Sequence, residues 1–148
     1  MGGEDSIKDP ERAGAVTSGV AQSNFDVYIG TEWLQLDPED ARARVLLTDD
    51  LRQPYGLLHG GVYSTLVESL CSYATAVAVY QDGMITMGQA IEVSILRPVT
   101  EGYAEARAVV RHRGRSTWVW EVEVLDDDEK LCALAKMTMA VRPAPTVP

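Results

Sequence analysis

The apolar residues of this chain recur at intervals of three and four in its middle and mostly at intervals of two on either side. Residues 61–80 form a segment that is too long for a strand, and its apolar residues recur at helical spacing. They are Val62, Leu66, Leu70, Ala74 and Val77. The pattern therefore predicts one long helix in the middle of the chain.

Downstream of this helix, apolar and polar residues alternate as they do in half-buried strands. The alternating segments are residues 91–95, 103–111, 118–125 and 131–141. Short turns join the last three, which makes them antiparallel neighbours. Upstream, residues 33–36 and 41–47 flank the turn Asp37-Pro38-Glu39-Asp40 and predict a hairpin. We therefore expect an α+β domain with one long helix against an antiparallel sheet of five or six strands.

The chain length of 148 residues fits a single domain, which we place at residues 23–142. Residues 1–22 are rich in Gly, Ala, Ser and Asp without periodicity, and we expect this segment to be disordered. The Pro-rich residues 143–148 are expected to form a loose C-terminal tail. Because the first 20 residues contain no apolar stretch flanked by basic residues, we expect a cytoplasmic protein.

Composition excludes several classes of function. With 13 Lys and Arg against 22 Asp and Glu, the formal charge of -9 repels nucleic acid and anionic membranes. The weakly charged residues 53–81 include Glu68 and several Ser, Thr and Gly, which favours a buried helix over a membrane span. Two cysteines without CxxC spacing and two histidines do not supply a structural zinc site. We expect no metal, and buried reduced thiols at Cys71 and Cys132.

Glu68 is the candidate for chemistry, because it is the only side chain between Arg52 and Asp82 that is charged at neutral pH. An unpaired buried carboxylate costs several kcal/mol. Either neighbouring hydroxyls satisfy it structurally, or it faces a wet cleft where a raised pKa is used in a reaction. On a helical wheel it shares a stripe of small and polar residues with Gly61, Ser64, Thr65, Ser72 and Thr75.

The loop of residues 55–61, Tyr-Gly-Leu-Leu-His-Gly-Gly, precedes the helix. Glycine allows a close approach of the backbone to a ligand, and the first N–H groups of a helix have no helical acceptor. These N–H groups can stabilise an oxyanion. The alternative is a turn that only needs positive φ, with His59 bracing the loop.

The distance between these two features makes a further prediction. Gly60 and Glu68 are separated by eight residues, which is about 12 Å along a helix. One chain can therefore hardly place both on the same carbonyl carbon. If both act on one substrate, two chains contribute, and a symmetric dimer has two identical sites.

These motifs resemble those of the hotdog-fold acyl-CoA thioesterases. The resemblance rests on residues 56–63, Gly-Leu-Leu-His-Gly-Gly-Val-Tyr, then Glu68, residues 91–98 ending in Arg-Pro, Gly102, and Gly-Arg-Ser-Thr at 114–117. It covers about residues 29–141. The sequence is most similar to the PaaI-like branch and to the 4-hydroxybenzoyl-CoA thioesterase type with the acid on the central helix. This family wraps an antiparallel sheet around the long helix and forms dimers, often paired into homotetramers.

The resemblance implies a role for each matching residue. The Gly60 N–H polarises the thioester carbonyl, and His59 supports the loop. Glu68 attacks the carbonyl or activates water. Gln53 and Ser72 help to hold the attacking group or the water.

The resemblance also implies that Arg97, Ser116 and Thr117 contact the phosphates of CoA, with Arg115 as a neighbour. The alternative is that the basic residues form a solvated turn and Ser116 only begins a strand. Some aryl-CoA members carry a further acid where this chain has Tyr73, so the acyl pocket is unassigned. The candidates to line it, which would serve equally as core, are Leu58, Tyr63, Val67 and Tyr73.

The expected function is thioester hydrolysis that releases a free acid and CoA, without a cofactor because CoA is part of the substrate. Two other functions stay open. A hydratase would normally pair a His with an acid at a different spacing from that of His59 and Glu68. A non-catalytic acyl-CoA binder could dispense with the carboxylate.

Overall fold

A computed structural model describes residues 22–145 of the chain. The helical elements are α1 (Asn24–Ile29), η1 (Asp49–Leu51), α2 (Gly60–Val79) and η2 (Tyr80–Asp82). The strands are β1 (Thr31–Asp37), β2 (Asp40–Leu46), β3 (Met84–Ile95), β4 (Tyr103–Arg113), β5 (Thr117–Leu125) and β6 (Leu131–Pro143).

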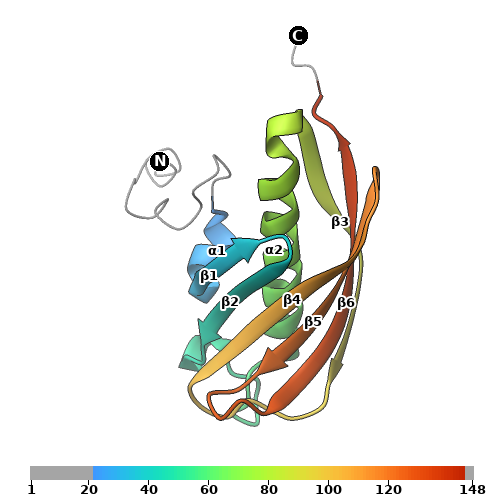
Figure 1. Cartoon of the computed structure of the whole chain (residues 1–148). Helices are drawn as coiled ribbons and strands as arrows, with labels where there is room; N and C mark the ends of the chain where they lie inside the picture. The colour runs from blue at the N-terminus through green and yellow to red at the C-terminus, as the bar shows by residue number, and fades with distance from the viewer. Residues whose placement is uncertain (1–21, 146–148) are drawn as a thin grey trace, which may run out of the picture.

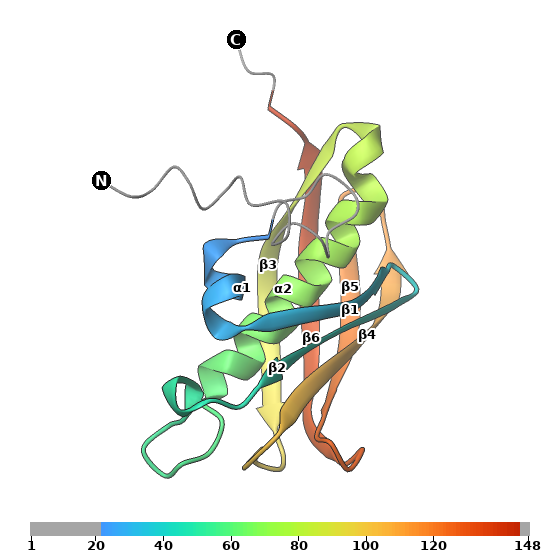
Figure 2. The same cartoon turned by 90° about the vertical axis from the view of Figure 1, so that its left-hand side faces the viewer.

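All six strands form one antiparallel sheet in the order β1-β2-β4-β5-β6-β3. The sheet curves around α2, which lies along its inner face (Figures 1 and 2). The sheet therefore confirms the expected α+β class and the antiparallel order of β4, β5 and β6. Strands β1 and β3 are its two edges, and β3 follows α2 directly in the chain.

Small side chains occupy the buried positions at which β2 pairs with β4. Ala41 pairs with Ala108, and Ala43 pairs with Ala106, and all four are fully buried. Larger buried residues lie on β5 and β6, among them Trp120, Met137 and Met139. Side-chain volume thus follows the curvature of the sheet, as close packing requires.

Helix α2 forms the other half of the core. Leu66, Leu70 and Ala74 are fully buried against the sheet. The stretch Gly60–Asp82 is apolar and long enough to cross a membrane, but 61% of its most apolar window is buried inside the fold. Its apolar character is therefore explained by the core that it helps to build.

The structure departs from the predicted elements in three places. Helix α1 was not predicted, and β3 begins at Met84 rather than at residue 91. The start of β3 does not alternate cleanly because its register shifts between Gly88 and Ala90. Pro143, the first residue of the expected loose tail, is the last residue of β6 and pairs with Met84. Residues 1–21 and 146–148 lie outside the described residues, so most of both expected loose ends is not described.

Thr75 was placed on the same stripe of α2 as Glu68, and the structure shows that the core covers this part of the stripe. Its side chain is fully buried and donates a hydrogen bond to the Cys71 carbonyl at 2.7 Å. The same hydroxyl accepts a hydrogen bond from Trp120 Nε1 at 3.0 Å. Thr75 therefore supports the core. The expected buried free thiols at Cys71 and Cys132 are confirmed.

We predict that Thr75→Val lowers the free energy of unfolding by about 1–3 kcal/mol, because it leaves the buried Trp120 Nε1 without an acceptor. Thr65→Val is the matched control, since the Thr65 hydroxyl also donates to a carbonyl four residues earlier but is exposed. Urea unfolding of the three proteins measures both effects. Equal stability of the two variants would contradict the assigned role of Thr75.

Candidate active site

Glu68 lies in the middle of α2 and faces a cavity of about 560 Å³ between α1, α2 and the start of β3. Ser72, one turn later on the same helix, donates a hydrogen bond from Oγ to Glu68 Oε1 at 3.2 Å and lines the same cavity. Within residues 22–145 no Lys, Arg or His forms a salt bridge with Glu68. The carboxylate is therefore open to a ligand in the cavity.

Gly88 on β3 makes room for this carboxylate. A Cβ atom at Gly88 would lie 2.8 Å from Glu68 Oε1 and 2.9 Å from Cε of Met137. Any other residue would force Glu68 or Met137 to move. Gly88 did not emerge from the sequence analysis. An isolated glycine within a strand is the signal that could have found it.

The helix begins with His59 as its N-cap. His59 Nδ1 accepts from the Gly61 N–H at 2.9 Å, and the His59 carbonyl accepts from the Val62 N–H at 2.9 Å. No acceptor for the Gly60 N–H is present among the described residues. His59 thus braces the loop, and Gly60 keeps a donor at the positive end of the helix dipole.

The glycines at the helix start do not serve a turn with positive φ. Among residues 22–145 the glycines with positive φ are Gly30, Gly56, Gly83 and Gly102, and Gly60 and Gly61 are not among them. Instead, a Cβ at Gly60 would lie 3.3 Å from Cδ1 of Ile95 at the end of β3. The tight contact with β3 accounts for glycine at position 60.

Gln53 lies in the loop before α2, and its side chain is used within that loop. Its Oε1 accepts a hydrogen bond from the Tyr55 N–H. Its backbone N–H donates to the Leu57 carbonyl at 2.8 Å. Gln53 and Gly60 thus belong to the helix start, whereas Glu68 and Ser72 lie two to three turns further along the helix. A single chain brings together Glu68 with Ser72, and Gly60 with His59 and Gln53.

The residues expected to contact CoA fall into two groups. Arg97 follows β3, and its N–H donates to Cys132 at the start of β6. Arg115 and Ser116 lie in the turn between β4 and β5, and Thr117 begins β5. This turn is beside the other end of β6, where Thr117 pairs with Ala140. Cys132 and Ala140 are eight residues apart along β6, about 26 Å. One chain does not bring the two groups onto one ligand.

Of the four candidates for the acyl pocket, Tyr73 lines the cavity, and the other three belong to the core. Tyr63 is buried, and its hydroxyl accepts from the Val99 N–H at 3.1 Å. Burial, with a smaller contribution from the charge of Glu68, raises the pKa of the Cys71 thiol. Cys71 is therefore a protonated core residue.

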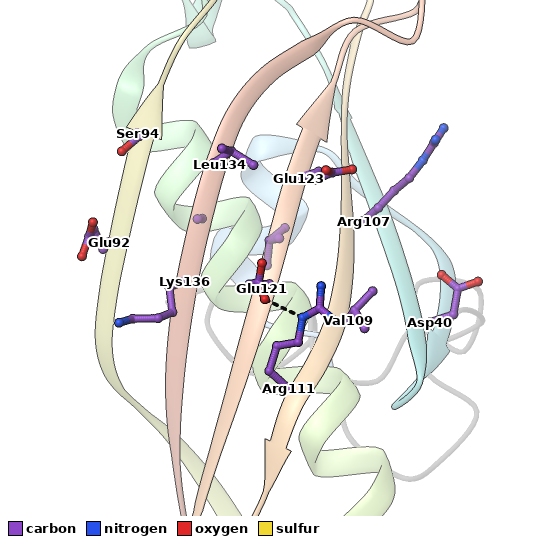
Figure 3. Close-up of a pocket in the computed structure, with 12 residues that line it drawn as sticks. Asp40, Glu92, Ser94, Arg107, Val109, Arg111, Glu121, Glu123, Leu134 and Lys136 are labelled. Atoms are coloured by element: carbon purple, nitrogen blue, oxygen red, sulfur yellow. Dashed lines mark hydrogen bonds and ion pairs between the residues drawn. The ribbon is translucent and has the colours of Figure 1, made fainter.

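A second hollow of about 520 Å³ lies on the outer face of the sheet, away from α2 (Figure 3). Its charges are largely paired: Arg111 contacts Glu121 at 2.5 Å, and Arg107 contacts Glu105 at 2.7 Å. It contains none of the residues predicted for catalysis or CoA binding. Within the described residues, no group of three or more His, Cys, Asp or Glu could hold a metal ion.

Comparison with known proteins agrees with this arrangement. Residues 55–133 match the family described as the Thioesterase superfamily. The chain belongs to this superfamily. A 1,4-dihydroxy-2-naphthoyl-CoA hydrolase from Listeria monocytogenes is 33% identical over 77% of this chain and 92% of its own length. A putative esterase from Haemophilus influenzae is 31% identical over 88% of this chain and 91% of its own length.

The solved structure of a mutant thioesterase from Pseudomonas aeruginosa superposes with a TM-score of 0.79. It is 30% identical and covers 94% of this chain and 97% of its own. The fold of the present thioesterase is therefore the hotdog fold expected from its motifs. The protein is a thioester hydrolase.

We predict that Gly88→Ala reduces the rate of thioester hydrolysis at least about tenfold, because the added Cβ displaces the Glu68 carboxylate. Ala90→Ser is the matched control. It adds one heavy atom at the next ladder position of β3, on the opposite face. A thiol-release assay, with circular dichroism to check folding, compares the variants. Wild-type turnover in folded Gly88→Ala would show that Glu68 needs no fixed position.

Proposed function

We propose that this thioesterase hydrolyses an acyl-CoA thioester to the free acid and CoA at sites that each combine two copies of the chain. The observation that carries the proposal is the separation of two complementary half-sites. One is Glu68 with Ser72 in the cavity, and the other is the unpartnered Gly60 N–H at the helix start.

The exposed edge of β3 supports pairing with a second copy. β3 is twelve residues long and lies at the edge of the sheet (Figure 1). Ile91 and Ile95 lie on the face directed toward α2, yet they are 42% and 48% exposed. A long apolar edge with unpaired backbone groups is a template for another strand. The α2 helix of a second copy would cover these two side chains.

Antiparallel pairing of two β3 strands would unite the half-sites. Glu68 contacts the β3 backbone at Gly88, and Gly60 lies beside Ile95 on the same strand. A two-fold axis midway between Gly88 and Ile95 places the Gly88 end of one strand beside the Ile95 end of the other. Glu68 of one copy then faces Gly60 and Gln53 of the second copy.

The same pairing supports a composite site for CoA. The Gly88 end of β3 is the end beside the turn of Arg115, Ser116 and Thr117, since Met87 and Thr117 both pair with Ala140. Arg97 of the second copy would arrive at this end. Guanidinium and hydroxyl groups suit the phosphates of CoA.

The proposed chemistry begins with polarisation of the thioester carbonyl by the Gly60 N–H and the helix dipole. In one route, Glu68 attacks the carbonyl carbon, the C–S bond breaks, and water hydrolyses the resulting mixed anhydride. In the other, Glu68 takes a proton from water, and the hydroxide attacks. Ser72 orients Glu68 in both routes, and the thiolate of CoA leaves and takes up a proton.

Three further expectations accompany this proposal: the enzyme is cytoplasmic, it uses no cofactor, and its dimers pair into homotetramers. The non-catalytic binder is not favoured, because the superfamily match and the named relatives indicate hydrolysis.

We predict that Glu68→Gln abolishes thioester hydrolysis while the protein stays folded and oligomeric, because the amide is neither a nucleophile nor a base. A thiol-release assay across short-chain, long-chain and aryl acyl-CoAs measures the loss, and size-exclusion chromatography checks assembly. Near-native turnover in this variant would remove Glu68 from the mechanism.

We also predict that two inactive variants restore each other. Gly60→Pro removes the N–H, and proline suits the first residue of a helix after the extended His59. Each variant alone should lose about 100-fold or more in rate. When Glu68→Gln and Gly60→Pro chains are mixed, half of the dimers carry one intact site of two, so about a quarter of wild-type activity should return. No recovery in mixed dimers would contradict a site shared between chains.

A further inference from the structure

Tyr55, in the loop before α2, carries the most exposed aromatic ring of the described residues. Its side chain is 88% exposed, more than any other large apolar or aromatic side chain within residues 22–145. It lies two residues after Gln53 and five before Gly60, the residues proposed to face Glu68 of a second copy. An aromatic ring left in water beside one half of a site is a reason to ask what covers it.

The backbone around Tyr55 is held in place by hydrogen bonds. Its own N–H donates to Gln53 Oε1, and the Gly56 N–H donates to the Gln53 carbonyl at 2.9 Å. The Arg52 guanidinium donates to the Gly56 carbonyl at 2.5 Å and to the Thr100 carbonyl at 3.2 Å, which ties the loop to the connection between β3 and β4. The loop therefore presents the ring in a defined position, so that little conformational entropy is lost when a partner covers it.

The Glu68 cavity has exposed apolar walls toward the end of α2. Its lining there includes Tyr80, directly after the helix, and Ile85, near the start of β3, and both side chains are exposed. Phe25 of α1 also lines the cavity and is exposed as well. One chain thus leaves the walls of a cavity of about 560 Å³ in contact with water. Exposed apolar walls of this kind indicate a site that another chain completes.

The antiparallel pairing of two β3 strands brings the loop and the cavity together. The two-fold axis reverses the direction of α2, so the helices of the two copies run antiparallel. The loop of residues 52–58 extends past the start of α2 (Figure 2). Since Gly60 of the second copy lies beside Glu68, this loop of the second copy extends further, toward the end of α2. Ala76 and Tyr80 line the cavity at that end.

We infer that Tyr55 is a specificity residue that acts across the interface: its ring closes the Glu68 cavity of the second copy and covers the part of the substrate beyond the thioester carbonyl. This inference rests on the proposed function and adds a residue to the shared site. Covering an apolar group removes its surface from water, so the ring raises the affinity for acyl groups that reach it. An acetyl group, with one carbon beyond the carbonyl, offers the ring little to cover.

The first experiment compares kcat/KM for acetyl-CoA, hexanoyl-CoA and benzoyl-CoA in the wild type, Tyr55→Ala, Tyr55→Phe and Tyr28→Ala. Tyr55→Ala should lower the value for the better of the two larger substrates about tenfold or more, and that for acetyl-CoA less than about threefold. Tyr55→Phe keeps the ring and should stay within about twofold of the wild type. Tyr28→Ala removes a ring that is 73% exposed on α1 and does not line the cavity, and it should leave all three values unchanged.

The second experiment tests which chain's cavity Tyr55 serves. Tyr55→Ala and Glu68→Gln chains are co-expressed in equal amounts, so that half of the dimers are mixed. In a mixed dimer the only carboxylate at position 68 belongs to the Tyr55→Ala chain, and it faces the intact Tyr55 of the other chain. For a tenfold effect of Tyr55→Ala, about a quarter of the wild-type kcat/KM should return, against about a twentieth if Tyr55 serves its own chain.

The inference is overturned by wild-type kcat/KM in Tyr55→Ala, by an equal loss with all three substrates, or by a mixture no more active than its slow sites alone. A wild type that hydrolyses acetyl-CoA but neither larger thioester also overturns it. If Glu68→Gln and Gly60→Pro chains restore each other while Tyr55→Ala and Glu68→Gln chains do not, only the inference fails. If the wild type hydrolyses no acyl-CoA, the proposed function fails as well.

Discussion

The close approach of β3 to the middle of α2 is the constraint on which the site depends. Glu68 occupies the space that a side chain at Gly88 would fill, with only 2.8 Å between its Oε1 and the place of a Cβ. The same strand meets the start of α2 at Gly60, where a Cβ would lie 3.3 Å from Cδ1 of Ile95. One strand thus contacts both half-sites, whereas the distance between them is set by the eight residues of α2 that separate Gly60 from Glu68.

The start of α2 satisfies its backbone donors selectively. His59 takes up the N–H groups of Gly61 and Val62 through its side chain and its carbonyl, but no described residue accepts from Gly60. A helix end that needed only stability would gain from capping this donor as well. The N–H that stays open is the one that lies beside the exposed end of β3, where a second copy would bring its carboxylate.

Periodicity was sufficient to predict the elements that bury one complete face. Helix α2 packs one face against the sheet, and strands β4 to β6 alternate buried and more exposed residues over enough of their length to be recognised. Helix α1 has only six residues, too few for a helical period, and the bulge between Gly88 and Ala90 hides the first half of β3. The site was predictable where its residues lie on one helix, as Glu68 and Ser72 do. The helical wheel could not show that Thr75 is buried. The cavity follows the face of Ser69, Tyr73 and Ala76, while the sheet covers the other edge of the stripe. Gly88 was missed because its role depends on a contact with Glu68, on an element that is distant in the sequence.

The exposed edge of β3 would be a liability in an isolated chain, and its features favour one defined partner over indiscriminate pairing. The bulge between Gly88 and Ala90 interrupts the ladder of hydrogen bonds, so that a neighbouring strand cannot slide along the edge without losing contacts. On the outer face of the same strand, Glu92 stands opposite Lys136 and places a charge between the apolar positions. We expect the bulge and the charge at Glu92 to favour the pairing in which the Gly88 end of one strand lies beside the Ile95 end of the other. The requirement to avoid aggregation and the requirement to assemble the proposed site then favour the same register.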